Sequence, residues 1–339
     1  MSTAVKFGYL LDFRQPPQLS QLDTAEFYAA MFQQVAYADQ AGLDSIWLTE
    51  HHFTEDGYLA AVMPAMAAIA ARTRRVTIGT YVLLAPFYHP LRLAEDAALI
   101  DVISNGRLRL GIGLGYRQEE FAGFQIARKE RLGRTLETIE ILKHAWTGER
   151  FSFKGKYFSF RDVQVLPRPI SQPHPELLWG GMAPEAIRRG AQLGLSFACN
   201  LGRREIEHYH QALRECGKDP AAFNVVNSRL VYLADSEEQA WREIEAPVLY
   251  QMTMYGKWLS AAGSATSSFR PEPAALRRNG VIGPPEVVTA RLQQILATTP
   301  MTELCLSMQL PGLDPRKALR SLERFATEVL PVLRKERVE

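Results

Sequence analysis

Histidine and acidic side chains gather in three short polar segments in the first half of the chain. The segments read EHH at 50–52, YH at 88–89 and YRQEEF at 116–121. An imidazole beside a carboxylate can serve as a general acid and base near neutral pH. We therefore take His51, His89 and Glu120 as the candidate catalytic residues.

A metal site is a competing interpretation of these histidines. The three segments contain neither HExxH nor an HxH that would put two imidazoles on one face of a strand. His51 and His52 are adjacent, so their side chains should point to opposite sides of an extended chain. We expect no metal ion here, and for His52 a structural role.

Two glycine-rich segments suit the binding of a cofactor. Residues 111–116 (GIGLGY) superficially match the dinucleotide-binding fingerprint, but the third glycine comes one place early and no helix starts at once. Small residues there would let a flat ring approach a strand, or would reflect close packing. Residues 180–183 (GGMA) precede a helix that Pro184 opens, so their N–H groups either suit a phosphate or form only a tight turn.

Eight strand-and-helix units would position these segments. Apolar runs that suggest strands, most of them followed by a helical pattern, cover residues 6–11, 44–49, 75–85, 106–115, 176–179, 195–200, 224–233 and 303–309. Such a count predicts an α/β fold with a single (β/α)8 (TIM) barrel domain over residues 1–339, rather than two doubly wound domains. Active sites of such barrels lie at the carboxyl ends of the strands, where the three polar segments fall.

Two segments stand outside this repeat. Residues 151–166 alternate apolar and polar side chains around a Lys-Gly-Lys turn, which predicts an inserted hairpin. Residues 253–283 are rich in Gly, Ser, Ala and Pro and lack clear periodicity, which predicts a long lid segment. Whether Met252, Tyr255 and Trp258 face a substrate or only pack is left open by the sequence.

Composition disfavours several classes of partner. The chain has 39 Lys+Arg against 37 Asp+Glu, a net charge of +2, so we expect neither nucleic acid nor an anionic membrane as a partner. Neither a bilayer-spanning apolar stretch nor a signal peptide is evident, so we expect a cytoplasmic protein. Cys199, Cys216 and Cys305 lack CxxC spacing, which favours small buried side chains over disulfides or a zinc site.

The motifs FGYLLDF, SIWLTEHHFTEDG, HPLRLAEDAALIDVISNGR and WGGMAPEAIRRGAQLGL together resemble the bacterial luciferase-like, flavin-dependent monooxygenase family. The resemblance implies a (β/α)8 barrel that takes reduced FMN from a separate flavin reductase. It further implies reaction with dioxygen to a flavin 4a-hydroperoxide, which oxidises a small or medium organic substrate. A homodimer is also implied. The alanine-rich stretches 60–71 and 94–98 are candidate surfaces for it, although alanine stripes suit packing of a helix on the barrel equally well.

The resemblance also assigns roles by position. His51 matches the family's catalytic histidine, and His89 and Glu120 match further site positions. The Tyr81–Val82 bond matches a non-prolyl cis peptide beneath the flavin. The implied cofactor contacts are Glu50, Tyr81, Val82, Gly113, Tyr116, Gly180, Gly181, Met182 and Ala183.

Two departures from luciferase bear on the cofactor and substrate. Leu114 stands where luciferase has the arginine that meets the FMN phosphate, which leaves backbone N–H groups and Arg117 or Arg188 as its expected partners. Gly113 stands where luciferase has a cysteine near the reacting carbon. We expect that glycine to open space and to argue against light emission from a long aldehyde.

Two other functions remain as alternatives. A deazaflavin-dependent oxidoreductase on the same barrel would transfer a hydride without oxygen, although the EHH motif favours FMN. A non-catalytic flavin-binding barrel is the other alternative, and His51 together with the long lid argues against it.

Overall fold

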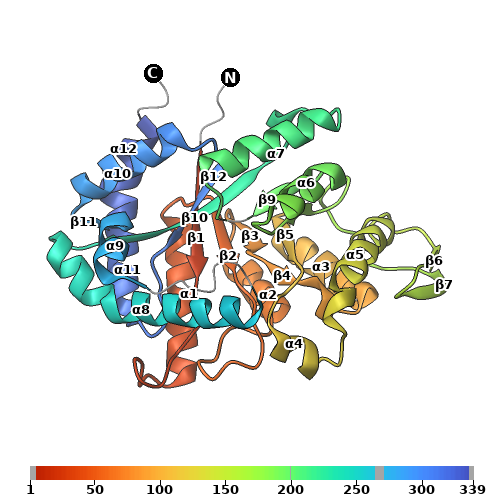
Figure 1. Ribbon diagram of the computed structural model, residues 1–339, viewed down its shortest axis with the longest axis horizontal. Coiled ribbons are helices and arrows are strands. Elements are labelled where there is room, and N and C mark those ends of the chain that lie inside the picture. Colours follow the sequence, from red (N-terminus) through yellow and green to blue (C-terminus); the bar gives the residue numbers. More distant parts are fainter. Residues whose placement is uncertain (1–4, 199, 264–270, 336–339) are drawn as a thin grey trace.

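Eight parallel strands close into a barrel in the computed structural model, which describes residues 5–198, 200–263 and 271–335 (Figure 1). In chain order they are β1 (Lys6–Leu11), β2 (Ser45–Leu48), β3 (Thr77–Thr80), β5 (Leu108–Gly113), β8 (Glu176–Trp179), β9 (Ser196–Ala198), β10 (Val225–Leu233) and β12 (Glu303–Ser307). Each strand pairs with the next, and β12 returns to β1. The short strands β4 (Leu83–Leu84) and β11 (Val281–Gly283) pair with β5 and β10. The predicted (β/α)8 barrel is confirmed.

Helices connect the strands and cover the outside of the barrel. They are α1 (Thr24–Gln40), α2 (Val62–Arg72), α3 (Pro90–Ser104), α4 (Gln118–Gly123), α5 (Arg131–Ala145), α6 (Pro184–Leu193), α7 (Arg203–Glu215), α8 (Glu237–Ala261), α9 (Pro273–Asn279), α10 (Pro285–Thr298), α11 (Pro315–Arg324) and α12 (Leu330–Lys335). Their starts follow local chemistry: Asp23 accepts hydrogen bonds from the first N–H groups of α1, and Pro90 and Pro184 open α3 and α6. The main apolar core includes buried side chains of both strands and outer helices.

A network of buried charges closes the amino end of the barrel interior. Arg109 donates to Glu176 at 2.7 Å and also to Glu303. Glu303 accepts from Ser45 and, at 2.6 Å, from the indole N–H of Trp47. Burial disfavours the charged form of Arg109, but the two carboxylates outweigh this and raise its pKa. The charges therefore satisfy one another below the apolar part of the interior.

Above this network the interior is apolar and centred on Trp47. A Cβ on Gly79 would lie 2.3 Å from its Cζ3 atom, and a Cβ on Gly8 would lie 3.0 Å from its Cδ1 atom. Glycine at these positions makes room for the indole between three adjacent strands. The other buried residues of this layer are Leu178, Ala198, Val226 and Cys305, with Leu10, Tyr81 and Val82 partly buried against them.

The predicted hairpin projects from the side of the barrel (Figure 1). Strands β6 (Phe151–Lys154) and β7 (Ser159–Val163) pair antiparallel. Glu137 on α5 accepts hydrogen bonds from the backbone N–H groups of Lys156, Tyr157 and Phe158 at the turn. One carboxylate thus holds the hairpin turn to the barrel.

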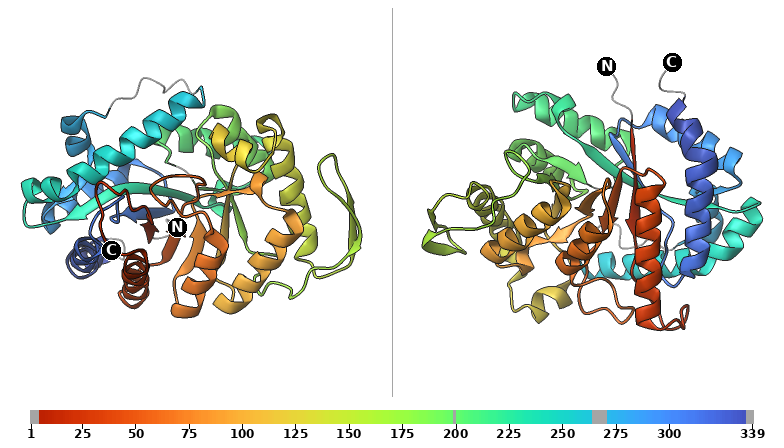
Figure 2. Two further views of the ribbon diagram at one scale, coloured as in Figure 1. Left: turned by 90° about the horizontal axis from the view of Figure 1, so that it is seen from below. Right: turned by 180° about the vertical axis from the view of Figure 1, so that it is seen from behind.

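The expectation that residues 253–283 lack regular structure is wrong for most of their length, whereas their role as a lid stays a prediction. Residues 253–261 are the end of α8, residues 273–279 form α9 and residues 281–283 form β11, while 264–270 lie outside the described residues. The segment continues a helix that begins at Glu237, capped by Ser236, and buries Trp258, so tertiary packing outweighs its small residues. The helix lies across the carboxyl ends of the strands (Figures 1 and 2).

The cysteines divide between core and surface. Cys305 is buried as predicted, and burial raises the pKa of its thiol. Cys216 is exposed, so the prediction of a buried side chain is wrong for it, because it follows the last turn of α7 at the surface. Cys199 lies outside the described residues.

Two further classes of feature are not found in the described part of the chain. None of its helices is both long and apolar enough to cross a membrane. Within the same residues, no group of three or more His, Cys, Asp or Glu side chains could hold a metal ion.

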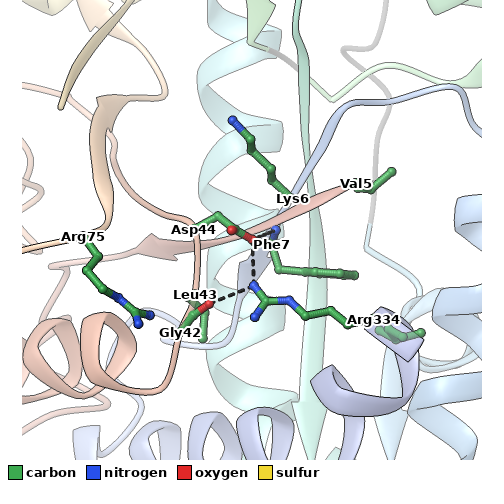
Figure 3. A pocket seen from close by; sticks show the side chains of 9 residues that line it. Val5, Lys6, Phe7, Gly42, Leu43, Asp44, Arg75 and Arg334 are labelled. Atoms are coloured by element: carbon green, nitrogen blue, oxygen red, sulfur yellow. Dashed lines mark hydrogen bonds and ion pairs between the residues drawn. The ribbon is translucent and has the colours of Figure 1, made fainter. Parts of the chain in front are cut away.

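A cleft of about 680 Å³ lies at the amino end of the barrel, opposite α8 (Figure 3). Asp44 accepts from the backbone N–H of Phe7 at 2.8 Å and from Arg334 at 3.1 Å, and Arg334 also donates to the carbonyl of Gly42. These contacts tie the last helix to the first two strands. We assign this end of the barrel to stability rather than chemistry.

Removing Glu303 should leave a guanidinium buried without its partner. We expect Glu303→Ala to lower the free energy of unfolding by about 3–5 kcal/mol, measured by urea denaturation. The control is Glu207→Ala, which removes an exposed ion pair with Arg203 on α7 and should cost less than about 1 kcal/mol. Equal losses in the two variants would contradict the role of the buried network.

Candidate functional site

A buried histidine and carboxylate pair stands at the carboxyl end of the barrel. His51 follows β2 and Glu120 lies on α4, and both residues are at most 6% exposed. The Nδ1 atom of His51 lies 2.7 Å from Oε1 of Glu120. The backbone N–H of His52 donates to the same oxygen at 3.0 Å. Two of the three predicted catalytic residues are therefore in direct contact.

Arg117, at the start of α4, braces this pair. Its Nη1 atom donates to the carbonyl of His52 at 2.6 Å and lies 3.5 Å from Oε1 of Glu120. The guanidinium also lies over the ring of Trp258, 4.5 Å from the ring centroid. The Nη1 contacts of Arg117 hold it at the Glu120 loop, and its expected role, or that of Arg188, as a phosphate partner stays a prediction.

The electrostatics of the pair define the roles of its members. Burial raises the pKa of Glu120, but the hydrogen bond and charge of His51, the N–H of His52 and the charge of Arg117 outweigh it, so the net pKa lies below its usual range. An ionised Glu120 accepts, so Nδ1 of His51 carries the proton and Nε2 is left to exchange one. The hydroxyl of Tyr116 lies 3.4 Å from that Nε2 atom, and burial raises the Tyr116 pKa.

Glu50, the neighbouring carboxylate, is saturated by donors from the protein. It accepts from the ring Nε2 of His52 at 2.9 Å, the backbone N–H of Leu84 at 2.7 Å and the hydroxyl of Tyr88 at 2.8 Å. These bonds join the ends of β2 and β4. His52 has the structural role that the sequence predicts, and Glu50 ties these loops together in addition to its proposed place near a cofactor.

Aromatic rings enclose the imidazole of His51. Ring centroids lie at 4.8 Å for Tyr58, 5.5 Å for Tyr116, 6.4 Å for Tyr255 and 5.1 Å for Trp258. Tyr255 and Trp258 come from α8, so this helix covers His51. Sequence reasoning missed Tyr58. It named Tyr116 as an implied cofactor contact and left open whether Tyr255 and Trp258 face a substrate or only pack.

The remaining predicted catalytic residue, His89, lies apart from this pair. It is the residue before α3 and is exposed. Its ring lies 5.9 Å from that of Phe158 and 6.3 Å from that of Phe160, at the inserted hairpin. The described contacts therefore bring His51 and Glu120 together without His89.

The glycines near the strand ends pack against Val82. The Tyr81–Val82 peptide is cis, at the position that the resemblance implies. A Cβ on Gly113 would lie 2.4 Å from Cγ2 of Val82, and a Cβ on Gly180 would lie 2.8 Å from its Cγ1. The expectation that Gly113 opens space is wrong, because the Val82 side chain fills it.

The GGMA loop stands open at the start of α6. Gly181 has φ of 156°, Met182 is 56% exposed, and Ala183 is the residue before the helix. Trp179, just before the loop, is buried with its indole N–H unpartnered. Arg188 on α6 is exposed.

Polar residues that sequence reasoning missed complete the mouth. The hydroxyl of Tyr81 donates to Oδ1 of Asn200 at 2.9 Å, and the hydroxyl of Ser228 donates to the same atom at 2.7 Å. Asn200 follows β9 and Ser228 lies in β10. Each comes two residues after an interior side chain, Ala198 or Val226, and this period of two along a strand would have indicated them.

A barrel with a buried imidazole and carboxylate pair at its carboxyl end has the architecture of a barrel enzyme. The family model for luciferase-like monooxygenases matches residues 5–303. The chain belongs to this family.

Individual relatives differ in their named cofactors. The chain is 29% identical to the flavin-dependent trigonelline monooxygenase, oxygenase component, of Acinetobacter baylyi. The match covers 93% of this chain and 92% of that protein. It is 35% identical to the F420-dependent glucose-6-phosphate dehydrogenase of Amycolatopsis mediterranei over 54% of this chain and 56% of that protein. The oxygenating constituent of 3,6-diketocamphane monooxygenase of Pseudomonas putida, solved with FMN, superimposes with a TM-score of 0.81 at 21% identity over 97% and 98% of the chains.

The lowered pKa of Glu120 predicts a pH-dependent stability. Ionised Glu120 stabilises the fold above its usual pKa of 4.5, and this contribution is lost as the pH falls through the lowered folded-state pKa. We expect Glu120→Gln to be destabilised relative to the natural protein at neutral pH, with the difference shrinking below about pH 4 in urea unfolding. Glu119→Gln, the exposed neighbour, should show no such dependence, and a constant difference for Glu120→Gln would refute the assignment.

Proposed function

We propose that the protein is the oxygenase component of a two-component monooxygenase. It would bind reduced FMN supplied by a separate flavin reductase and insert one atom of dioxygen into a small or medium organic substrate, the other atom leaving as water. The observation that carries the proposal is the buried His51–Glu120 pair at the mouth of a barrel of this family. A homodimer and a cytoplasmic location remain predictions.

The residues at the mouth fit a flavin. Leu10, Tyr81 and Val82 form an apolar floor that is only partly buried. Gly113 and Gly180 allow Val82 to complete that floor. Flat apolar surface suits the isoalloxazine ring, which would supply the activation of dioxygen once reduced FMN is bound.

The GGMA loop is the candidate holder of the phosphate. N–H groups at the start of a helix attract anions, and α6 starts directly after Ala183. The unpartnered indole N–H of Trp179 offers a further donor, since it lies 4.0 Å from where a Cβ of Gly181 would be. Gly180, Gly181, Met182 and Ala183 thus remain the proposed contacts.

The protein's own contribution to chemistry is proton handling and exclusion of water. Nε2 of His51 can donate or accept a proton while Glu120 holds the opposite side of the ring. Tyr116 adds a protonated hydroxyl beside Nε2. Tyr255 and Trp258 cover the imidazole from α8, which keeps solvent from the pair.

Cofactor choice is testable without turnover. The F420-dependent relative motivates the deazaflavin alternative, and a non-catalytic barrel would bind a flavin without consuming oxygen. Under anaerobic conditions we expect reduced FMN to bind at least tenfold more tightly than reduced F420 by fluorescence titration. A separate assay for oxygen transfer to substrate, with reductase and NAD(P)H present, tests the non-catalytic alternative. Tighter binding of F420 would favour the hydride-transfer alternative instead.

Substitution of His51 should separate binding from chemistry. We expect His51→Gln to lower product formation by about 100-fold or more, as loss of a general acid and base does, while FMN affinity changes less than about threefold. His89→Gln is the matched variant, and its exposed position beside the hairpin predicts a small effect. If the two variants exchange these outcomes, His89 is the catalytic residue.

A further inference from the structure

A second cavity lies at the carboxyl end of the barrel, between the loop after β2 and α8. Its volume is about 660 Å³, within the range of small-molecule sites. The loop contributes Phe53, Glu55 and Asp56, and α8 contributes Tyr250, Lys257 and Trp258. Arg117 also lines it. The described contacts of the catalytic pair leave this cleft without a role.

Two buried charged side chains line the cleft with a polar atom unpartnered. Asp56 is 2% exposed, and its Oδ2 accepts from the hydroxyl of Tyr250 at 3.0 Å while Oδ1 has no hydrogen-bond partner. Arg117 is 6% exposed, and its Nε has no hydrogen-bond partner, with Oε2 of Glu119 4.0 Å away. Buried polar atoms are normally satisfied, so one acceptor and one donor at one cleft point to a ligand that carries the complementary groups.

The cleft has one acidic and one basic side chain among its buried residues, and another such pair at its exposed rim. Asp56 and Arg117 form the buried set, and the exposed side chains of Glu55 and Lys257 stand at the rim. A ligand with a single charge would be attracted by one of the two charges at each depth and repelled by the other. A molecule with one cationic or proton-donating group and one anionic group would pair at both ends.

Aromatic side chains supply the walls. Phe53, Tyr250 and Trp258 line the cleft, and Phe53 is 59% exposed. Phe53 also has φ of 54°, an uncommon conformation for a bulky residue, which costs free energy and recurs at functional sites. Aromatic walls with one ring this exposed favour a flat, unsaturated ligand.

Trp258 separates the cleft from the catalytic imidazole. Its ring lies 5.1 Å from that of His51 and 4.5 Å from the guanidinium of Arg117. The ring of Trp258 thus lines the cleft on one side and contacts the imidazole of His51 on the other.

We propose that this cleft recognises the substrate, and that the substrate is a small amphoteric aromatic or heteroaromatic molecule with a carboxylate and a cationic or proton-donating nitrogen. Asp56 receives the nitrogen and Arg117 receives the carboxylate. The assignment of the ligand as substrate rests on the proposed function.

Binding to the flavin-free protein tests the proposal. Calorimetric titration would compare 4-(aminomethyl)benzoate, which carries both charges on a benzene ring, with benzoate and benzylamine. We expect the doubly charged probe to bind at least tenfold more tightly than either other probe. Asp56→Asn should reduce that advantage to less than threefold, whereas Asp162→Asn on the distant hairpin should leave it unchanged.

A second variant keeps the test decisive if Asp56→Asn does not fold. Glu55→Lys changes only the exposed rim and should shift the preference towards benzoate by several-fold. Absence of binding by all three probes, equal affinities, or insensitivity to both variants would overturn the proposal. Titration of FMN into the same preparations distinguishes this failure from failure of the proposed function, because flavin binding does not depend on the cleft.

Discussion

The packing of the barrel interior is the constraint on which the site depends. Arg109 and Glu303 neutralise each other at the amino end, and the indole of Trp47 lies over the arginine with its N–H bonded to Glu303. With the lower half filled, interior side chains become only partly buried at Tyr81 and Val82. In the part of the chain that the structure describes, the partly buried interior side chains therefore lie toward the carboxyl end, where the loop after β2 carries the imidazole and α4 carries the carboxylate.

Two glutamates near that end differ in role because their surroundings differ. Glu50 accepts three hydrogen bonds from protein groups and joins two strand ends. Oε1 of Glu120 accepts hydrogen bonds from His51 and from the N–H of His52, and Oε2 is buried without a hydrogen-bond partner. A saturated carboxylate is a structural link, whereas one with a free oxygen beside an imidazole can respond to a proton transfer. The sequence places both residues after strands that end at the same side of the barrel and cannot separate these roles.

The sequence predicted what depends on local periodicity. Eight strands and the hairpin were identified because apolar spacing and turn residues are read within a few positions. His51 and Glu120 were found because both follow strands that end at the same side of a barrel. Contacts between distant segments were not predictable. The residues around Gly113 in the sequence do not indicate that the side chain of Val82 fills the space beside it. The same limit explains Arg117, whose partner ring at residue 258 lies on a different element.

Helix α8 connects these features. Composition suggested an irregular lid, yet a regular helix can hold two rings in fixed positions, which a flexible loop cannot. Trp258 contacts both His51 and Arg117, and the hydroxyls of Tyr255 and Tyr58 share a hydrogen bond of 2.9 Å beside the imidazole. Displacement of α8 would remove three kinds of contact at once: the ring cover of His51, the cation–π contact of Arg117 and the hydroxyl pair. Because Arg117 in turn braces Glu120, the position of one helix bears on the geometry of the His51–Glu120 pair as well as on its access to solvent.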